Sequence, residues 1–186
     1  MNANPVIEFL GRRRSVSALG LQAPGPDPAS LAHILAIAMR VPDHGKLAPW
    51  RFVVIDGPAK KRLVTKMEAI AATRHDARKA AVSLAKLERP PLCVAVVSRP
   101  QEAAIPEWEQ VLSAGAACMN LVTAALAAGY GANWITEWYA YDASALALLD
   151  IREDERIAGF VMIGTTASAP DDRTRPTPAD LITYLD

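Results

Sequence analysis

The sequence has few cysteines, no excess of charge of one sign and no apolar run at its start. Its two cysteines, Cys93 and Cys118, lie among apolar residues and lack a CxxC spacing, which argues against a disulfide framework or a zinc site. We therefore expect two buried, reduced thiols. Twenty Lys and Arg residues balance twenty Asp and Glu residues, so no overall field draws the chain to nucleic acid or to an anionic membrane.

Motifs of several common enzyme classes are also missing. No GxSxG, GxxxxGK[ST] or HExxH pattern occurs, and His33, His44 and His75 lie in separate predicted elements without metal-ligand spacing. Hydrolases, nucleoside triphosphatases and metalloenzymes are therefore disfavoured, and no metal site is expected. Residues 1–11 lack a basic segment followed by an apolar one, so we predict no signal peptide and a cytoplasmic protein. Residues 111–128 are apolar but rich in small residues, which favours an internal helix over a membrane span.

What is present is the composition of a single globular domain over residues 1–186, with 51% hydrophobic and 22% charged residues. Hydrophobic periodicity, capping residues and Gly or Pro breaks predict alternating helices and short strands. The predicted helices are 5–12, 28–40, 59–88 as one helix or as two with a break at 73–76, a central helix between Pro106 and Gly129, and 143–149. The predicted strands are 52–55, 92–97, 132–136 and 157–163.

The long segments between these strands favour crossover connections over hairpins. We therefore expect an α+β or α/β sandwich built on one sheet. The proline-rich tail, residues 170–186, is predicted to be extended and to lie on another surface, for which a partner subunit is one candidate.

Three consecutive arginines, Arg12, Arg13 and Arg14, are followed by Ser15 and form the first candidate site. Arginine side chains bind phosphate oxygens in a bidentate geometry, and a serine adds a small donor, so the cluster could hold the phosphate of a mononucleotide. Cations also favour the C-terminus of a helix without any ligand, and the cluster taken alone favours this second explanation.

The loop 40–50 is the second candidate. It carries Arg40, His44 and Lys46 among prolines, directly before the predicted strand 52–55. Prolines stiffen the loop and reduce the entropy lost when these side chains meet a ligand. His44 could simply cap the loop, but this density of donors in a short rigid segment favours a ligand site.

The segment 129–136 is the third candidate, with Gly129 and Gly131 between the central helix and a strand that contains Trp134. Glycines let a backbone approach a flat ring closely, and exposed N–H groups there could bond its heteroatoms. A glycine after a helix is more often only its C-cap. The segment is not a dinucleotide fingerprint, because the order of strand, turn and helix is reversed and the third glycine is missing.

Taken together, these features resemble the nitroreductase family of FMN-dependent oxidoreductases, in its short single-domain branch. Each motif is weak alone, but their joint order spans nearly the whole chain. The motifs are Arg13, Arg14 and Ser15; Pro42, Asp43 and His44 with Pro49 and Trp50; Trp108 and Glu109 leading into 113–116; 129–134; and 159–165.

The resemblance implies an α+β fold, a three-layer sandwich with a mostly antiparallel sheet between helices. It also implies a homodimer in which the tail from Pro170 onward is exchanged between subunits and FMN lies at their interface. The expected activity is ping-pong transfer of reducing equivalents from NADH or NADPH to nitroaromatic, quinone or related small acceptors. No catalytic side chain is expected, because the flavin carries the chemistry.

The resemblance also assigns residues to the cofactor. Arg13, Arg14 and Ser15 would bind the FMN phosphate. Gly164 would also contact the cofactor, and Arg173 or Arg175 would add a further contact to the phosphate. From the other side the flavin would meet Arg40, His44 and Lys46, and a cation among them would stabilise negative charge on the ring. The flavin ring would be lined by Trp134, Ile135 and Thr136. Residues 124–129 would lie near the nicotinamide nucleotide.

This chain departs from the family pattern at two places. Lys46 and Ala48 stand where many members have Asn and Gln, and Ile135 stands where a polar residue would be unsurprising. Polar contacts to the flavin therefore differ here.

Three other hypotheses remain. The first is reductive dehalogenation or flavin-consuming chemistry on the same scaffold, which needs lid residues that this short chain lacks. The second is a non-catalytic flavin-binding or sensor protein, and the third is an interaction domain without a ligand.

Overall fold

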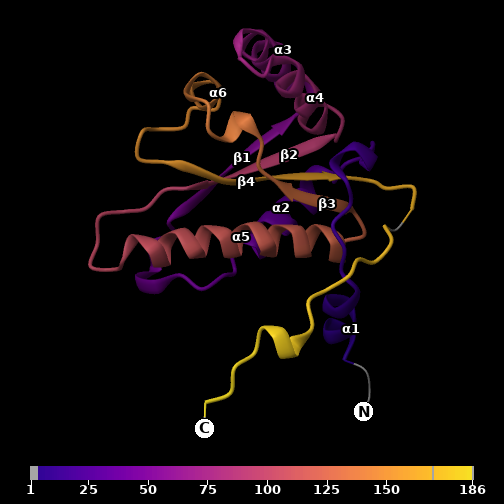
Figure 1. Ribbon diagram of the computed structural model, residues 1–186, viewed down its shortest axis with the longest axis vertical. Helices are drawn as coiled ribbons and strands as arrows, with labels where there is room; N and C mark the ends of the chain where they lie inside the picture. Colours follow the sequence, from indigo (N-terminus) through magenta and orange to yellow (C-terminus); the bar gives the residue numbers. More distant parts are fainter. Residues whose placement is uncertain (1–3, 169, 186) are drawn as a thin grey trace.

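The computed structural model describes residues 4–168 and 170–185 (Figure 1). Its main helices are α1 (Pro5–Arg12), α2 (Pro28–Ala38), α3 (Gly57–Thr73), α4 (Ala77–Glu88), α5 (Glu107–Ala127) and α6 (Ala143–Ala147). Its strands are β1 (Trp50–Asp56), β2 (Leu92–Ser98), β3 (Gly131–Ile135) and β4 (Arg156–Gly164). The predicted elements are all confirmed in kind and order, with ends that shift by at most two residues.

The break predicted at 73–76 is also confirmed, and one arginine accounts for it. Arg74 has an extended backbone at the end of α3. Its guanidinium bonds the carboxylates of Asp76, at 2.9 Å, and Asp142, at 2.8 Å, and lies 4.9 Å from the centre of the Trp138 ring. These contacts hold the turn between α3 and α4 against the segment before α6.

The four strands form one sheet in the order β1-β2-β4-β3, and every neighbouring pair is antiparallel. Of the two sheet architectures predicted, the α+β one is therefore confirmed, because an α/β fold would place parallel strands side by side. Strand β2 is buried along its whole length, as expected for an apolar strand at the centre of a sheet with both faces covered.

Helices cover both faces of the sheet. On one face Cys93, Ala95 and Val97 of β2 join a core with α3 and α4, and on the other face the alternate residues Val94 and Val96 join a core with α2 and α5. Side chains of a strand point alternately to the two faces, so one apolar strand supplies both cores.

Both cysteines are buried and free, as predicted. Burial raises the pKa of the Cys93 thiol far above its usual range and raises the pKa of Cys118 to about 12. The reactive species of cysteine is the thiolate, so both groups are unreactive at neutral pH.

Helix α5 is long and apolar enough to cross a membrane, but half of its most apolar stretch is buried within the protein. It packs on β2, β3 and β4 and against α2, which confirms an internal helix. Helix α1 and the tail both lie on the side of α5 away from the sheet (Figure 1). The tail is extended apart from a short turn at Pro178–Asp180, and residues 171–185 are exposed.

Candidate functional site

Arg12 is the last residue of α1, Arg13 caps the helix and Arg14 follows it, and the chain then runs beside β3. The amide of Val16 donates to the carbonyl of Ala132 at 2.9 Å, and the side chain of Asn133 donates to the carbonyl of Val16 at 2.7 Å. A Cβ at Gly131 would lie 2.5 Å from Leu21, so this close approach requires glycine. The arginine cluster is therefore fixed beside the strand that carries Trp134.

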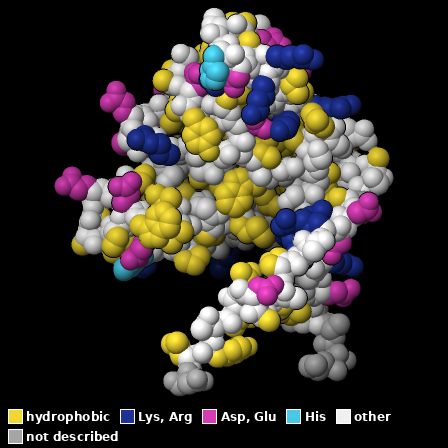
Figure 2. Space-filling view, in the orientation of Figure 1, with side chains coloured by type: hydrophobic (Ala, Val, Ile, Leu, Met, Phe, Trp, Pro, Cys, Tyr) yellow, Lys and Arg dark blue, Asp and Glu magenta, His cyan; other side chains and the backbone are white. Residues whose placement is uncertain are grey.

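A cavity of about 520 Å³ opens between this cluster and the end of α5. It is lined by Phe9, Arg12, Arg13, Arg14, Val16, Leu126, Ala127, Tyr130, Thr166 and Pro170. Figure 2 shows basic side chains gathered where the tail leaves the body of the protein. Three arginines line this concave surface, so positive charge is concentrated there on a chain of zero net charge.

The individual arginines are held differently. Arg12 lies 3.5 Å from Glu8, one turn earlier on the same exposed helix, which fits the simple explanation of a cation at a helix end. Arg14 is turned away from α1. Its Nε donates to the carbonyl of Asp171 at 2.8 Å and lies 3.5 Å from the Asp172 carboxylate, which also lies 3.5 Å from Arg175. Arg14 therefore ties the tail to the arginine cavity, and the Asp172 carboxylate links Arg14 to Arg175.

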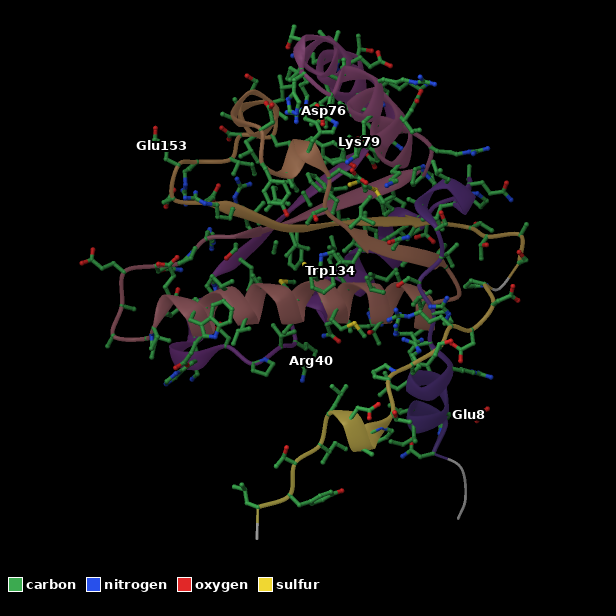
Figure 3. The ribbon with its side chains drawn as sticks, in the orientation of Figure 1. Glu8, Arg40, Asp76, Lys79, Trp134 and Glu153 are labelled. Carbon is green, nitrogen blue, oxygen red and sulfur yellow. The ribbon has the colours of Figure 1, made fainter. Side chains whose placement is uncertain are left out.

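Trp134 covers the end of the sheet on the face toward α5 (Figure 3). Its indole Nε1 donates to the carbonyl of Ala158 at 3.2 Å, and the ring lies so close to Gly159 that a Cβ there would be 1.8 Å from Nε1. Ile135 points to the opposite face, where its side chain is partly buried and packs on the core. Thr136 is exposed just after the strand.

Two glycines near this site have structural roles. Gly129 has a φ of +88° and ends α5, as expected for a C-cap. A Cβ at Gly164 would lie 2.9 Å from the carbonyl of Gln22, where the chain before α2 pairs with the residue after β4. The structure thus gives Gly164 a packing role beside its predicted place at the cofactor.

The loop before β1 is fixed by hydrogen bonds to its own chain. The Asp43 carboxylate accepts from the amides of Leu47, at 3.1 Å, and Ala48, at 2.9 Å. On α5, the Ser113 hydroxyl donates to the carbonyl of Pro42 at 2.7 Å and accepts from the Trp50 indole at 3.1 Å. We did not predict these roles for Asp43 and Ser113, although a polar residue inside a small apolar helix was a signal for Ser113.

This loop also has strained backbone. Lys46 and Ala48 have φ values of 56° and 47°, in the left-handed region that residues with a side chain seldom adopt. Such positions cost on the order of 1–3 kcal/mol each and persist only where the surrounding structure enforces them. The loop is therefore built into one shape, with the side chains of Arg40, His44 and Lys46 exposed along it.

His44 has one close partner. Its Nδ1 lies 2.7 Å from the Oε2 of Glu109, in the first turn of α5. The arginine cavity, in contrast, is lined by Leu126 and Ala127 in the last turn. The eighteen residues from Glu109 to Ala127 correspond to about 27 Å of helix. Within one chain, the arginines therefore lie beside β3 and the last turn of α5. The loop that carries His44 lies at the opposite end of this helix.

The comparison with known proteins identifies the family. A model of the nitroreductase family matches residues 10–165. The chain belongs to the nitroreductase family. It is 35% identical over 185 residues to "Putative NAD(P)H nitroreductase YdjA" of Escherichia coli (strain K12), which covers 96% of this chain and 98% of that protein.

Two solved structures of nitroreductases show the same fold. The nitroreductase-like family protein from Bacillus cereus has a TM-score of 0.86 at 20% identity, covering 100% of this chain and 98% of that one. The nitroreductase with bound FMN from Bacteroides fragilis NCTC 9343 has a TM-score of 0.74 at 21% identity, covering 99% and 100%. The resemblance to the nitroreductase family drawn from the motifs is thus confirmed.

Across residues 4–168 and 170–185, no group of three or more His, Cys, Asp or Glu side chains is arranged to hold a metal ion.

Proposed function

We propose that this member of the family is an FMN-dependent oxidoreductase that passes reducing equivalents from NADH or NADPH to nitroaromatic, quinone or related small acceptors by a ping-pong mechanism. The observation that carries the proposal is the arginine cavity fixed beside β3 and Trp134. Two relatives support it by name, since YdjA is described as an NAD(P)H nitroreductase and the Bacteroides fragilis protein holds FMN.

The residues present fit FMN. Arg13 and Arg14 offer guanidinium forks for its phosphate, with the Ser15 hydroxyl beside them and Arg175 reached through the tail. Trp134 offers a flat aromatic surface beside a strand whose backbone is approached closely at Gly131. When bound, FMN supplies the hydride and electron transfer that no side chain of the protein can carry out.

The protein's own part is binding and electrostatics. Arg13 and Arg14 would anchor the phosphate, and Trp134 would shield one side of the ring from water. Arg40 and Lys46 would place positive charge where negative charge develops on the ring, which preorganised cations stabilise strongly in a partly dry site. The segment 124–129, at the end of α5, would lie near the nicotinamide nucleotide.

A homodimer would complete this site. The His44 loop and the arginine cavity lie at opposite ends of α5, so both can meet one flavin only if a second copy supplies one of them. Helix α5 also exposes an apolar face, with Trp108 68%, Leu112 53% and Met119 40% exposed. Apolar surface of this kind marks an interaction site, and we propose a second copy as its partner.

The tail would take part in the same dimer. Leu181, Ile182, Tyr184 and Leu185 are all more than half exposed on a segment that extends from the body of one chain. We propose that the tail is exchanged and covers the other subunit. The dimer would act in the cytoplasm, where NADH and NADPH are available.

The first test is to purify the protein with excess FMN, remove free ligand and record the visible absorption. We expect the spectrum of bound flavin, and an Arg14→Ala variant should bind FMN at least about tenfold more weakly, since bonds to a charged group contribute on the order of 1.5–3 kcal/mol. Arg78→Ala, an exposed arginine on α4, is the matched control and should not change binding.

Two outcomes would change the conclusion. Bound flavin without steady oxidation of NADH or NADPH in the presence of an acceptor would indicate the alternative, a non-catalytic flavin-binding or sensor protein. A wild-type protein that stays colourless with added FMN would overturn the proposal and return the arginines to a role in ending α1.

A further inference from the structure

The hydrogen bond between His44 and Glu109 joins two elements that are 65 positions apart in the chain. His44 belongs to the strained loop before β1, and Glu109 belongs to the first turn of α5. The distance of 2.7 Å between Nδ1 and Oε2 is short for an N–H···O bond and typical of one that involves a charged group.

Fold stability does not account for this pair. The side chains of His44 and Glu109 are 63% and 45% exposed, and exposed ion pairs contribute only about 0–1 kcal/mol. The loop is already held by Asp43 and by Ser113. An additional bond to an exposed side chain fixes the direction of the imidazole ring and leaves the loop's backbone as it was.

The bond also determines which ring nitrogen carries hydrogen. An ionised carboxylate can only accept hydrogen bonds, so the hydrogen in this contact lies on Nδ1. In a neutral imidazole the other nitrogen, Nε2, then has a free lone pair. The side chain of His44 is 63% exposed, which leaves room for a ligand beside the ring.

We propose that Glu109 is a positioning residue: it holds the Nδ1 hydrogen of His44, so that Nε2 is kept as a hydrogen-bond acceptor for an N–H or O–H group of the flavin in the site that a second copy completes. The inference rests on the proposed function and adds a residue to it. It differs from the earlier assignment of His44 alone, because it makes the recognition depend on a carboxylate outside the loop.

A test that needs no flavin is the imidazole nitrogen spectrum of the flavin-free protein, read by ¹⁵N NMR at a pH where His44 is neutral. The wild type should show the hydrogen on Nδ1. Glu109→Ala should shift His44 toward the form with the hydrogen on Nε2, whereas Glu107→Ala, in the same turn of α5, should not. A mixture of both forms in the wild type would overturn the proposal.

A second test uses FMN affinity. Glu109→Ala should raise the Kd for FMN about three- to tenfold, the range expected for one neutral hydrogen bond, and Glu107→Ala should leave the Kd unchanged. In a His44→Ala background the Glu109→Ala change should have no further effect, because a residue that acts through His44 loses its role when the imidazole is gone. Circular dichroism of each variant checks that the fold is intact.

The outcomes separate this inference from the proposed function. If the wild type binds FMN and Glu109→Ala binds it equally well, the positioning role is wrong and the proposed function stands. If Glu109→Ala weakens binding equally with and without His44, Glu109 acts by another route and the inference fails. A wild type that binds no FMN would overturn both.

Discussion

The two ends of α5 are built in different ways. At its first turn, the loop before β1 is held by side chains of the same chain and keeps two strained residues, Lys46 and Ala48, in one conformation. At its last turn, the arginine cavity is lined on one side by the start of the tail, which bonds Arg14 and is exposed over residues 171–185. One half of the candidate site is thus fixed by contacts within a single chain, whereas the other half is the one that we propose a ligand and a second copy complete.

The largest expected effect is at the rigid end. Glu155 is 1% exposed, and its two carboxylate oxygens accept from Arg51 at 2.8 and 2.7 Å, which ties the start of β4 to the start of β1. Glu155→Ala should lower the free energy of unfolding by about 3 kcal/mol, because it leaves the partly buried Arg51 without its carboxylate partner and with only the carbonyl of Asp150 to accept from it. Urea denaturation measures the change, and Glu153→Ala is the exposed control. A loss of unfolding free energy below about 1 kcal/mol would show that the ion pair between Glu155 and Arg51 does not hold this end of the protein.

The same ion pair predicts a pH dependence. Hydrogen bonds from Arg51 lower the pKa of Glu155 from an ordinary 4.5 to about 2. A carboxylate with a lowered pKa in the folded state stabilises the fold fully above pH 4.5, and this contribution is lost as the pH falls toward 2. The unfolding free energy of a Glu155→Gln variant should therefore change less over that interval than that of the wild type. Equal acid dependence would contradict the assignment.

A medium effect is expected at the loop itself. Asp43→Ala removes the acceptor of the Leu47 and Ala48 amides and should cost about 2 kcal/mol, as for the loss of a strong helix cap. Hydrogen exchange should show these two amides opening faster than the rest of the protein. Asp43→Asn keeps one carbonyl oxygen as an acceptor, so exchange of these amides should be intermediate between that of the wild type and that of Asp43→Ala. Unchanged exchange would mean that other contacts hold the loop.

The smallest effect is expected at the open end. A chain that ends at Ser168 should unfold with the same free energy per protomer to within about 1 kcal/mol, because residues 171–185 are exposed and surface changes have small effects. If the tail is exchanged as we propose, sedimentation should nevertheless show the shortened chain shifting from dimer to monomer. A large loss of protomer stability would mean that the tail belongs to the core, and the contrast between the two ends would be lost.

Local chemistry explains what could be predicted from the sequence. Asp27 before Pro28 marked the start of α2, and both amides of the first turn indeed bond the Asp27 carboxylate, at 2.9 and 3.0 Å. The continuous apolar run at β2 predicted a buried strand, because a strand covered on both faces carries apolar residues at every position. These signals depend on neighbours in the chain, which a sequence displays directly.

Contacts between distant residues could not be predicted in this way. The His44–Glu109 pair spans 65 positions and the bond from Arg14 to Asp171 spans 157. Ala48 adopts a left-handed conformation that alanine rarely adopts, so no local sequence signal predicts it. The resemblance to a family indicated which segments to examine, whereas the partners of their side chains depend on the packing of the whole chain.

The contact between Trp134 and Gly159 has a consequence for inheritance. A β-carbon at position 159 would overlap the indole, so any other residue there requires the ring to leave its place on the sheet. A lineage can therefore replace the glycine only if the Trp134 ring moves or is itself replaced. The two positions, 25 residues apart, are thus expected to vary together.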